Sequence, residues 1–299
     1  MSFFKKWTLT TSIFFLFFFL LQDSLFAQEK SSVFVSILPQ KYFVNRIAKN
    51  LVNVQVLVKP GANPATYAPS PLQMTSISKA KVFFSIGVPF EKKWLPKIER
   101  LYPKIKIVKT DQGIKKIPIH KHDHDHSLDH HREVPQTYNF DPHIWLSPTL
   151  VMIQARQILL ALQFIDPKNK KIFEQNYKNF MGDLVELDIQ LMNMFNRQKQ
   201  YKFMVFHPSW GYFAKSYGLL QFPIEIEGKE IRPSQLGKLI KMARANNIRV
   251  VFAQPQFSSK SAKLIAREIG GKVVFMDPLA HDWKKNLINV AGQIKQLSN

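Results

Sequence analysis

The stretch that divides this chain is Gln136-Thr-Tyr-Asn-Phe-Asp-Pro-His-Ile-Trp-Leu-Ser-Pro148. Ser147 followed by Pro148 is typical of a helix start, because a serine side chain accepts hydrogen bonds from free backbone N–H groups and proline fits the first helical position. Pro142 restricts the residue before it. His143 is therefore predicted to lie in a defined loop directly before a helix, and we interpret the rest of the chain as the scaffold of a site there.

Immediately upstream lies a tract with six histidines and three aspartates, His120-Lys-His-Asp-His-Asp-His-Ser-Leu-Asp-His-His131. Histidine-rich tracts are typical of metal binding, and residues 113–139 have no apolar period, which predicts a mobile loop. Three roles stay open for the tract: a metal collector or sensor, a solvated linker, or an arm that delivers metal to a fixed site. The candidate auxiliary ligands are His120, His122, His124, His126, His130 and His131.

On both sides of this region, short β-rich runs alternate with helical patterns. The strands expected before it are 33–37, 53–58, 82–85 and 105–108, and those expected after it are 203–206, 220–226, 249–253 and 272–276. Short strands separated by helices predict parallel pairing with helices on both faces of the sheet. The predicted fold class is therefore α/β, with two similar lobes and a site in the cleft between them.

A long helical pattern lies between the two sets of strands. It begins near Asp166-Pro167 and continues to about Arg197, which would make it about 30 residues, or roughly 45 Å, long. We interpret it as a rigid connection between the lobes; a helix buried within one domain is the alternative. The predicted boundaries are a signal peptide at 1–27, an N-terminal lobe at 28–167, a linker helix at 168–198 and a C-terminal lobe at 199–299.

The N-terminus predicts export. Lys5-Lys6 precedes the apolar run 13–21, and Ser24-Leu-Phe-Ala27 is typical of a signal cleavage site, so we expect cleavage after Ala27 and a periplasmic protein. No later segment is expected to span a membrane. Cysteine is absent, which excludes disulfides and a lipid-anchored cysteine. The net charge of +21 does not indicate nucleic acid here, because the export signal leads away from it. We expect a monomer.

Two further polar residues follow expected strands directly. In parallel sheets, ligands gather outside the carboxyl ends of strands. His207 follows the strand 203–206, and Asp277 follows 272–276. Gln254, at the end of another strand, would line the same cleft, although an amide is a poor zinc ligand. Singly, each has an ordinary alternative, such as a loop histidine or a helix-capping aspartate. Together with His143 they favour one shared site, and two imidazoles with one carboxylate suit zinc.

Four segments resemble the zinc- and manganese-binding periplasmic receptors of ABC importers: Pro60-Gly-Ala-Asn-Pro-Ala-Thr-Tyr-Ala-Pro-Ser-Pro71, Asp141-Pro-His-Ile-Trp-Leu-Ser-Pro148, Val205-Phe-His-Pro-Ser-Trp-Gly-Tyr-Phe-Ala214 and Phe275-Met-Asp-Pro-Leu279. The resemblance implies two lobes joined by a rigid helix, with a metal ion held between them and delivered to a permease and its ATPase. It also implies that His143, His207 and Asp277 are metal ligands. Histidine at 207, where manganese receptors often carry glutamate, favours zinc as the transported ion.

One position departs from that family. Ala65 stands where most members carry a ligand histidine in the first loop. Water or an imidazole from the tract at 120–131 would take its place, and we favour water because ordering a loop costs roughly 1–2 kcal/mol per residue. Asp141 is expected either to orient His143 or to serve as a turn residue. Lining aromatics and a surface histidine are also expected: Tyr67, Trp145, Trp210 and His281.

Two other classes of function would also fit some of these residues. Three protein ligands and an open position also describe a zinc-dependent hydrolytic metalloenzyme, but the chain has no His-Glu-x-x-His helix, no Gly-x-Ser-x-Gly elbow and no glycine-rich phosphate loop. An adhesin or scaffold that uses the basic surface would keep its function without His143 and His207. We therefore predict a receptor without catalytic or cofactor-binding residues, for zinc or, as the alternative, manganese.

Overall fold

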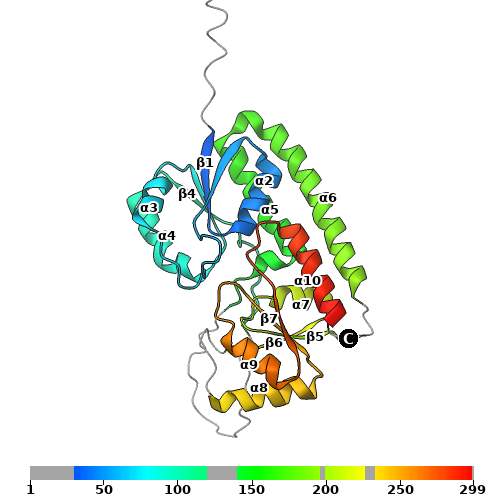
Figure 1. Ribbon diagram of the computed structural model, residues 1–299. Helices are drawn as coiled ribbons and strands as arrows, with labels where there is room; N and C mark the ends of the chain where they lie inside the picture. The colour runs from blue at the N-terminus through cyan, green and yellow to red at the C-terminus, as the bar shows by residue number, and fades with distance from the viewer. Residues whose placement is uncertain (1–29, 120–139, 196–198, 226–232, 298–299) are drawn as a thin grey trace, which may run out of the picture. The chain divides into compact units, whose positions relative to one another are not determined.

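The computed structural model describes residues 30–119, 140–195, 199–225 and 233–297, and residues from Ser31 onward form one compact unit. The predicted signal peptide at 1–27 and the histidine tract at 120–131 lie outside the described residues. The described part is α/β, as predicted, with two parallel four-stranded sheets flanked by helices (Figure 1).

The two sheets have the same strand order. The first is ordered β2-β1-β3-β4, and the second is ordered β6-β5-β7-β8. Every pairing within them is parallel. The strands are β1 (Ser31–Val35), β2 (Val52–Val56), β3 (Val82–Ser85), β4 (Lys106–Lys109), β5 (Lys202–Val205), β6 (Leu220–Pro223), β7 (Val250–Ala253) and β8 (Lys272–Phe275).

The strands that lie inside each sheet are the apolar ones, because both of their faces are covered by helices. All residues of β3 and β7 are buried, whereas the edge strands β4 and β8 keep exposed lysines at Lys106, Lys109 and Lys272. The flanking helices are α2 (Leu38–Ala48), α3 (Pro71–Ile77), α4 (Pro89–Leu101), α7 (Gly211–Tyr217), α8 (Pro233–Ala245), α9 (Lys260–Glu268) and α10 (Trp283–Leu297).

The connection between the sheets consists of η1 (Ile144–Leu146), α5 (Pro148–Ile165), η2 (Pro167–Asn169) and α6 (Lys170–Met194). Asp166-Pro167 starts a 3-10 turn rather than the long helix, so α6 has 25 residues and is shorter than expected. It contacts α2 and α5 on the first-sheet side and α10 on the other, as Figure 1 shows. The helix therefore touches elements that belong to both sheets, while the predicted domain boundaries stay a prediction.

Two expectations about α5 need correction. Ser147 precedes the helix and Pro148 begins it, but the Ser147 hydroxyl bonds to the hydroxyls of Thr149 (2.9 Å) and Ser216 (3.1 Å) and does not cap a backbone N–H. Contrary to the expectation of no later span, α5 is long and apolar enough to cross a membrane by length and composition alone. Its contacts with α2, α6 and β4 bury part of its apolar surface.

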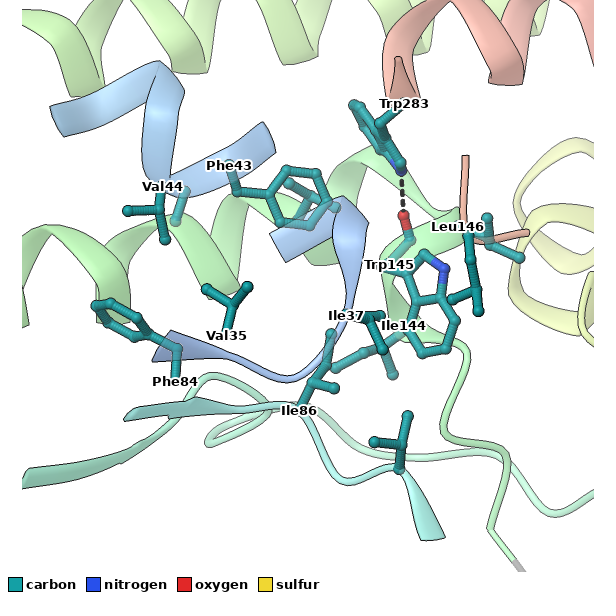
Figure 2. Close-up of a cluster of buried hydrophobic side chains, with 14 of the residues drawn as sticks. Val35, Ile37, Phe43, Val44, Phe84, Ile86, Ile144, Trp145, Leu146 and Trp283 are labelled. Carbon is teal, nitrogen blue, oxygen red and sulfur yellow. Dashed lines mark hydrogen bonds between the residues drawn. The ribbon is translucent and has the colours of Figure 1, made fainter. Parts of the chain in front are cut away.

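One cluster of buried side chains connects the two sheets. It begins under β1 and β3, with Val35, Phe43 and Phe84, and continues through Trp145 to Trp283 of α10. Figure 2 shows these side chains and the bond that the Trp283 indole N–H donates to the Trp145 carbonyl, at 2.7 Å. The loop that follows His143 is therefore part of the core and not a surface connection.

Candidate metal centre

His143 lies in a buried loop that Asp141 organises. The Asp141 carboxylate oxygen Oδ1 accepts hydrogen bonds from the backbone N–H of His143 (2.9 Å) and from its ring nitrogen Nδ1 (2.6 Å). Asp141 itself is tied to the chain before the loop, because its N–H donates to the Ile117 carbonyl at 2.8 Å. Of the two roles open for Asp141, the orienting role has direct geometric support.

His207 lies two residues beyond Val205, the last residue of β5, and so at the carboxyl edge of the second sheet. Its Nδ1 lies 2.5 Å from Oε1 of Glu225, and its ring stacks on Phe257 with the centroids 4.6 Å apart. Gln254 holds the His207 backbone at both ends: its Oε1 accepts from the His207 N–H (3.1 Å) and its Nε2 donates to the His207 carbonyl (2.7 Å). The position of this imidazole is therefore fixed by three side chains from the second sheet.

The two imidazoles lie side by side, with ring centroids 5.2 Å apart. A carboxylate oxygen accepts hydrogen bonds, so Asp141 and Glu225 each bond the Nδ1 of their histidine, and Nε2 is the ring nitrogen that these bonds leave available to a metal ion. Burial lowers the pKa of the His143 imidazole, against the opposing effect of Asp141. His143 is therefore neutral near pH 7, which is the form that binds a metal ion.

Asp277 lies two residues beyond Phe275, the last residue of β8, on the same carboxyl edge of the second sheet. Its Oδ1 accepts from Nε2 of Gln256 (2.6 Å) and from the N–H of Leu279 (2.9 Å). The next residue, Pro278, accepts a hydrogen bond from the Trp145 indole N–H at 2.7 Å, which connects the Asp277 turn to the His143 loop. In the part of the chain that the structure describes, no three His, Cys, Asp or Glu side chains form a group that could hold a metal. The ligand set of three stays a prediction.

The loop with Ala65 has its own supports. The Ala65 N–H donates to Oδ1 of Asn63 (2.8 Å), and the Pro64 carbonyl accepts from the Phe90 N–H (3.2 Å). The Ala65 side chain is exposed. Position 65 is thus held at the start of α4 without offering a metal-binding group.

The predicted lining aromatics have different surroundings. Trp145 does lie against His143, with ring centroids 5.1 Å apart. Tyr67 packs on Phe90 instead, and Trp210 is a core residue that packs edge-on against Phe213. Of these three residues, Trp145 is the one with a described contact to a site histidine. His281 is exposed just before α10, as expected.

Sequence reasoning missed Glu225 and Phe257, which contact the His207 ring. One signal was available for Glu225, since it follows β6 closely and so belongs to the same edge as His207 and Asp277. No local pattern singles out Phe257, because its stacking on His207 joins residues 50 positions apart in the chain, 257 − 207. The arrangement as a whole places two imidazoles beside carboxylates, a donor set that suits a divalent transition metal.

Comparison with known proteins agrees with this chemistry. The family model described as "Zinc-uptake complex component A periplasmic" matches residues 33–296. The high-affinity zinc uptake system protein ZnuA of Bacillus subtilis (strain 168) is 28% identical over 255 residues, which are 84% of this chain and 79% of that protein.

Two solved structures are similar along most of the chain. A crystal structure of ZnuA is 40% identical, with a TM-score of 0.82, and the match covers 90% of this chain and 100% of that one. A zinc-bound ZnuA with residues 138–173 of its own sequence deleted is also 40% identical, with a TM-score of 0.80 and coverage of 90% and 98%.

Proposed function

The chain belongs to the ZnuA family of periplasmic zinc-uptake components, and on that premise we propose that it binds zinc in the periplasm and delivers it to an ABC permease and its ATPase. Members of this family are substrate-binding receptors and not enzymes. The observation that carries the proposal for this chain is the pair of imidazoles of His143 and His207, 5.2 Å apart, each with its Nδ1 on a carboxylate.

Zinc is the favoured ion because the paired groups are imidazoles. Zinc accepts imidazole nitrogens readily, whereas manganese prefers sites richer in oxygen. The similarity to a zinc-bound ZnuA structure supports this choice. A manganese receptor remains the alternative, and it would have to recruit additional carboxylate or water ligands around the same two histidines.

The proposed ligands are His143, His207 and Asp277. Both hydrogen bonds described for the Asp277 carboxylate use Oδ1, so the other carboxylate oxygen, Oδ2, is the atom we propose for the ion. With alanine at position 65, a water molecule completes the four ligands that zinc prefers. Glu225 and Asp141 act behind the ligands, because they bond the ring nitrogens that face away from the ion.

The proposal is tested by zinc titration of the metal-free protein in competition with a chromophoric chelator, with manganese titrated in parallel. We expect one tight zinc site that binds manganese far more weakly. Replacing His143 and His207 together with alanine should lower the affinity of that site at least about 1,000-fold, or about 4 kcal/mol, because two of the three protein ligands are lost. His281→Ala is the matched control, since that histidine is exposed before α10.

An anomalous-scattering map at the zinc edge would then identify the ion and its ligands. Unchanged tight binding in the double variant would refute the site, and tighter binding of manganese than of zinc would replace zinc with the alternative. Hydrolytic activity that depends on zinc would contradict the receptor function.

A further inference from the structure

The turn that carries His207 also contacts the loop that carries His143. Tyr212, at the start of α7, donates its hydroxyl proton to the Asp141 backbone carbonyl (2.9 Å) and accepts a hydrogen bond from the Ile117 N–H (3.1 Å). The Tyr212 side chain is buried, and burial raises the pKa of its hydroxyl to about 12, so it remains a donor near neutral pH. One phenol therefore ties both chain segments that hold Asp141.

Gly211 lies against the carboxylate of the same aspartate. A Cβ atom at position 211 would be 2.7 Å from Oδ2 of Asp141 and 3.6 Å from Cδ1 of Ile117. Contacts below 3.0 Å essentially never occur for a real Cβ, so any side chain at position 211 would force this carboxylate or the backbone of residue 211 to shift. The other oxygen of this carboxylate, Oδ1, is the atom that bonds the His143 ring.

The turn between His207 and Gly211 is itself well supported. The Ser209 N–H donates to the His207 carbonyl (2.8 Å), and the Trp210 N–H donates to Oε1 of Gln221 (2.8 Å). Gln254 also holds the His207 backbone, so this turn is hydrogen-bonded at His207, Ser209 and Trp210. A displacement at Gly211 therefore has little room to relax within the turn.

We infer that Gly211 and Tyr212 are positioning residues for His143, so that residues 207–212 set both imidazoles of the metal centre. His207 stands at one end of this turn as a proposed ligand. Gly211 and Tyr212, at the other end, fix the backbone and the carboxylate of Asp141, which in turn orients His143. The inference rests on the proposed metal-binding function. It adds to that function a route by which the turn after β5 controls a histidine in the segment that connects the two sheets.

The first test is Tyr212→Phe, which removes the hydroxyl and keeps the ring. Groups that orient a metal-bound imidazole typically change affinity 10–100-fold, so we expect zinc affinity to fall about tenfold in the chelator competition. The visible d–d spectrum of the cobalt-substituted protein should change as well, because it reports ligand geometry. Tyr217→Phe is the matched control: it also removes a largely buried tyrosine hydroxyl, one that bonds Asp188 of α6, and should leave affinity and spectrum unchanged.

The second test is Gly211→Ala, paired with Gly182→Ala, where an added Cβ meets nothing within 4 Å. We expect Gly211→Ala to weaken zinc binding at least tenfold and Gly182→Ala to leave it unchanged. If Gly211 acts through Asp141, adding Gly211→Ala to Asp141→Ala should weaken binding no further, because neighbouring mutations that share one route are not additive. A full additional loss in the double variant would overturn this route.

Equal zinc affinities and cobalt spectra for Tyr212→Phe, Tyr217→Phe and the unmodified protein would overturn the inference while leaving the receptor function intact. If the unmodified protein bound no zinc tightly, the proposed function itself would fail. If Tyr212→Phe unfolds, its melting temperature shows this. The double-mutant cycle of Gly211→Ala with Asp141→Ala then tests the inference.

Discussion

The carboxyl edges of the two sheets have the same topology but carry different polar side chains. In both sheets the second strand of the spatial order comes first in the chain, so the two edges present equivalent turns. The first edge holds Ser36, Gln40, Glu91 and Thr110, and the second holds His207, Glu225, Gln254 and Asp277. The first set forms hydrogen bonds among its own members and with the backbone. The second set holds the His207 imidazole through Nδ1, so Nε2 takes no part in those hydrogen bonds.

At the first edge, Glu91 is the centre of a closed network. Its carboxylate accepts from the Ser36 hydroxyl (2.5 Å) and from the N–H groups of Ile86 (2.9 Å) and Gly87 (2.7 Å). Gln40 bonds the backbone of β1 through Ser36 and that of β3 through Phe84, and its Nε2 also bonds Thr110. These bonds join the ends of the strands, so this edge serves stability.

At the second edge, a glutamine has the same function as Gln40, because Gln254 bonds the His207 backbone. The difference lies in the carboxylate. Glu225 bonds one nitrogen of an imidazole and so directs the other nitrogen, while Glu91 bonds groups that have no second ligating atom. Topology therefore determines where a site can form, and the residue opposite the carboxylate determines whether it does.

The largest effect that would test this contrast concerns Glu91. Burial raises its pKa from 4.5 to about 7. The folded protein therefore holds a proton that the unfolded chain loses between these values, so the stabilising contribution is fully present below pH 4.5 and is lost as pH rises to about 7. The linked loss in the free energy of unfolding is about 3 kcal/mol.

The measurement is urea unfolding of the unmodified protein and Glu91→Gln across this range of pH. The free energy of unfolding of Glu91→Gln should lack this pH-dependent loss. Glu99→Gln, which changes an exposed acid on the same helix, should show the same loss as the unmodified protein. Zinc affinity at pH 7 should be the same in all three folded proteins. A Glu91→Gln variant that is folded but binds zinc much more weakly would break the contrast between the two edges.

An intermediate effect is expected from Ala65→His, which adds an imidazole to the first-sheet side. If water occupies the fourth position, a protein ligand that replaces it should raise zinc affinity about tenfold, or about 1.4 kcal/mol. Ala68→His places the same side chain at another exposed position of the loop and should have no effect. Equal affinities for the two variants would show that position 65 does not reach the ion.

The smallest effect is expected from the histidine tract, which lies outside the described residues. Replacing its six histidines with asparagine should reduce the number of weakly bound zinc ions and change the affinity of the tight site less than twofold, under about 0.5 kcal/mol. Titration calorimetry separates the two classes of ion. Disappearance of the tight site would mean that an imidazole from the tract, and not water, completes the coordination.

Much of the fold could be predicted because it depends on local patterns. Buried strands such as β3 and β7 are short apolar runs between helical patterns, and His207 and Asp277 lie within two residues of the ends of β5 and β8. The errors came from tertiary contacts. Ser147 has a capping position, yet a hydroxyl of α7, that of Ser216, attracts its side chain. The contacts of His207 with Glu225 and Phe257 likewise join separate elements.

Trp145 is held twice by one short piece of chain. Its indole N–H donates to the Pro278 carbonyl, and its own carbonyl accepts from the Trp283 indole N–H. Residues 278 and 283 therefore both bond this tryptophan. Separating the Asp277 turn from the His143 loop would break both of these hydrogen bonds, which lie among buried side chains. The two hydrogen bonds therefore couple the Asp277 turn to the loop that holds His143.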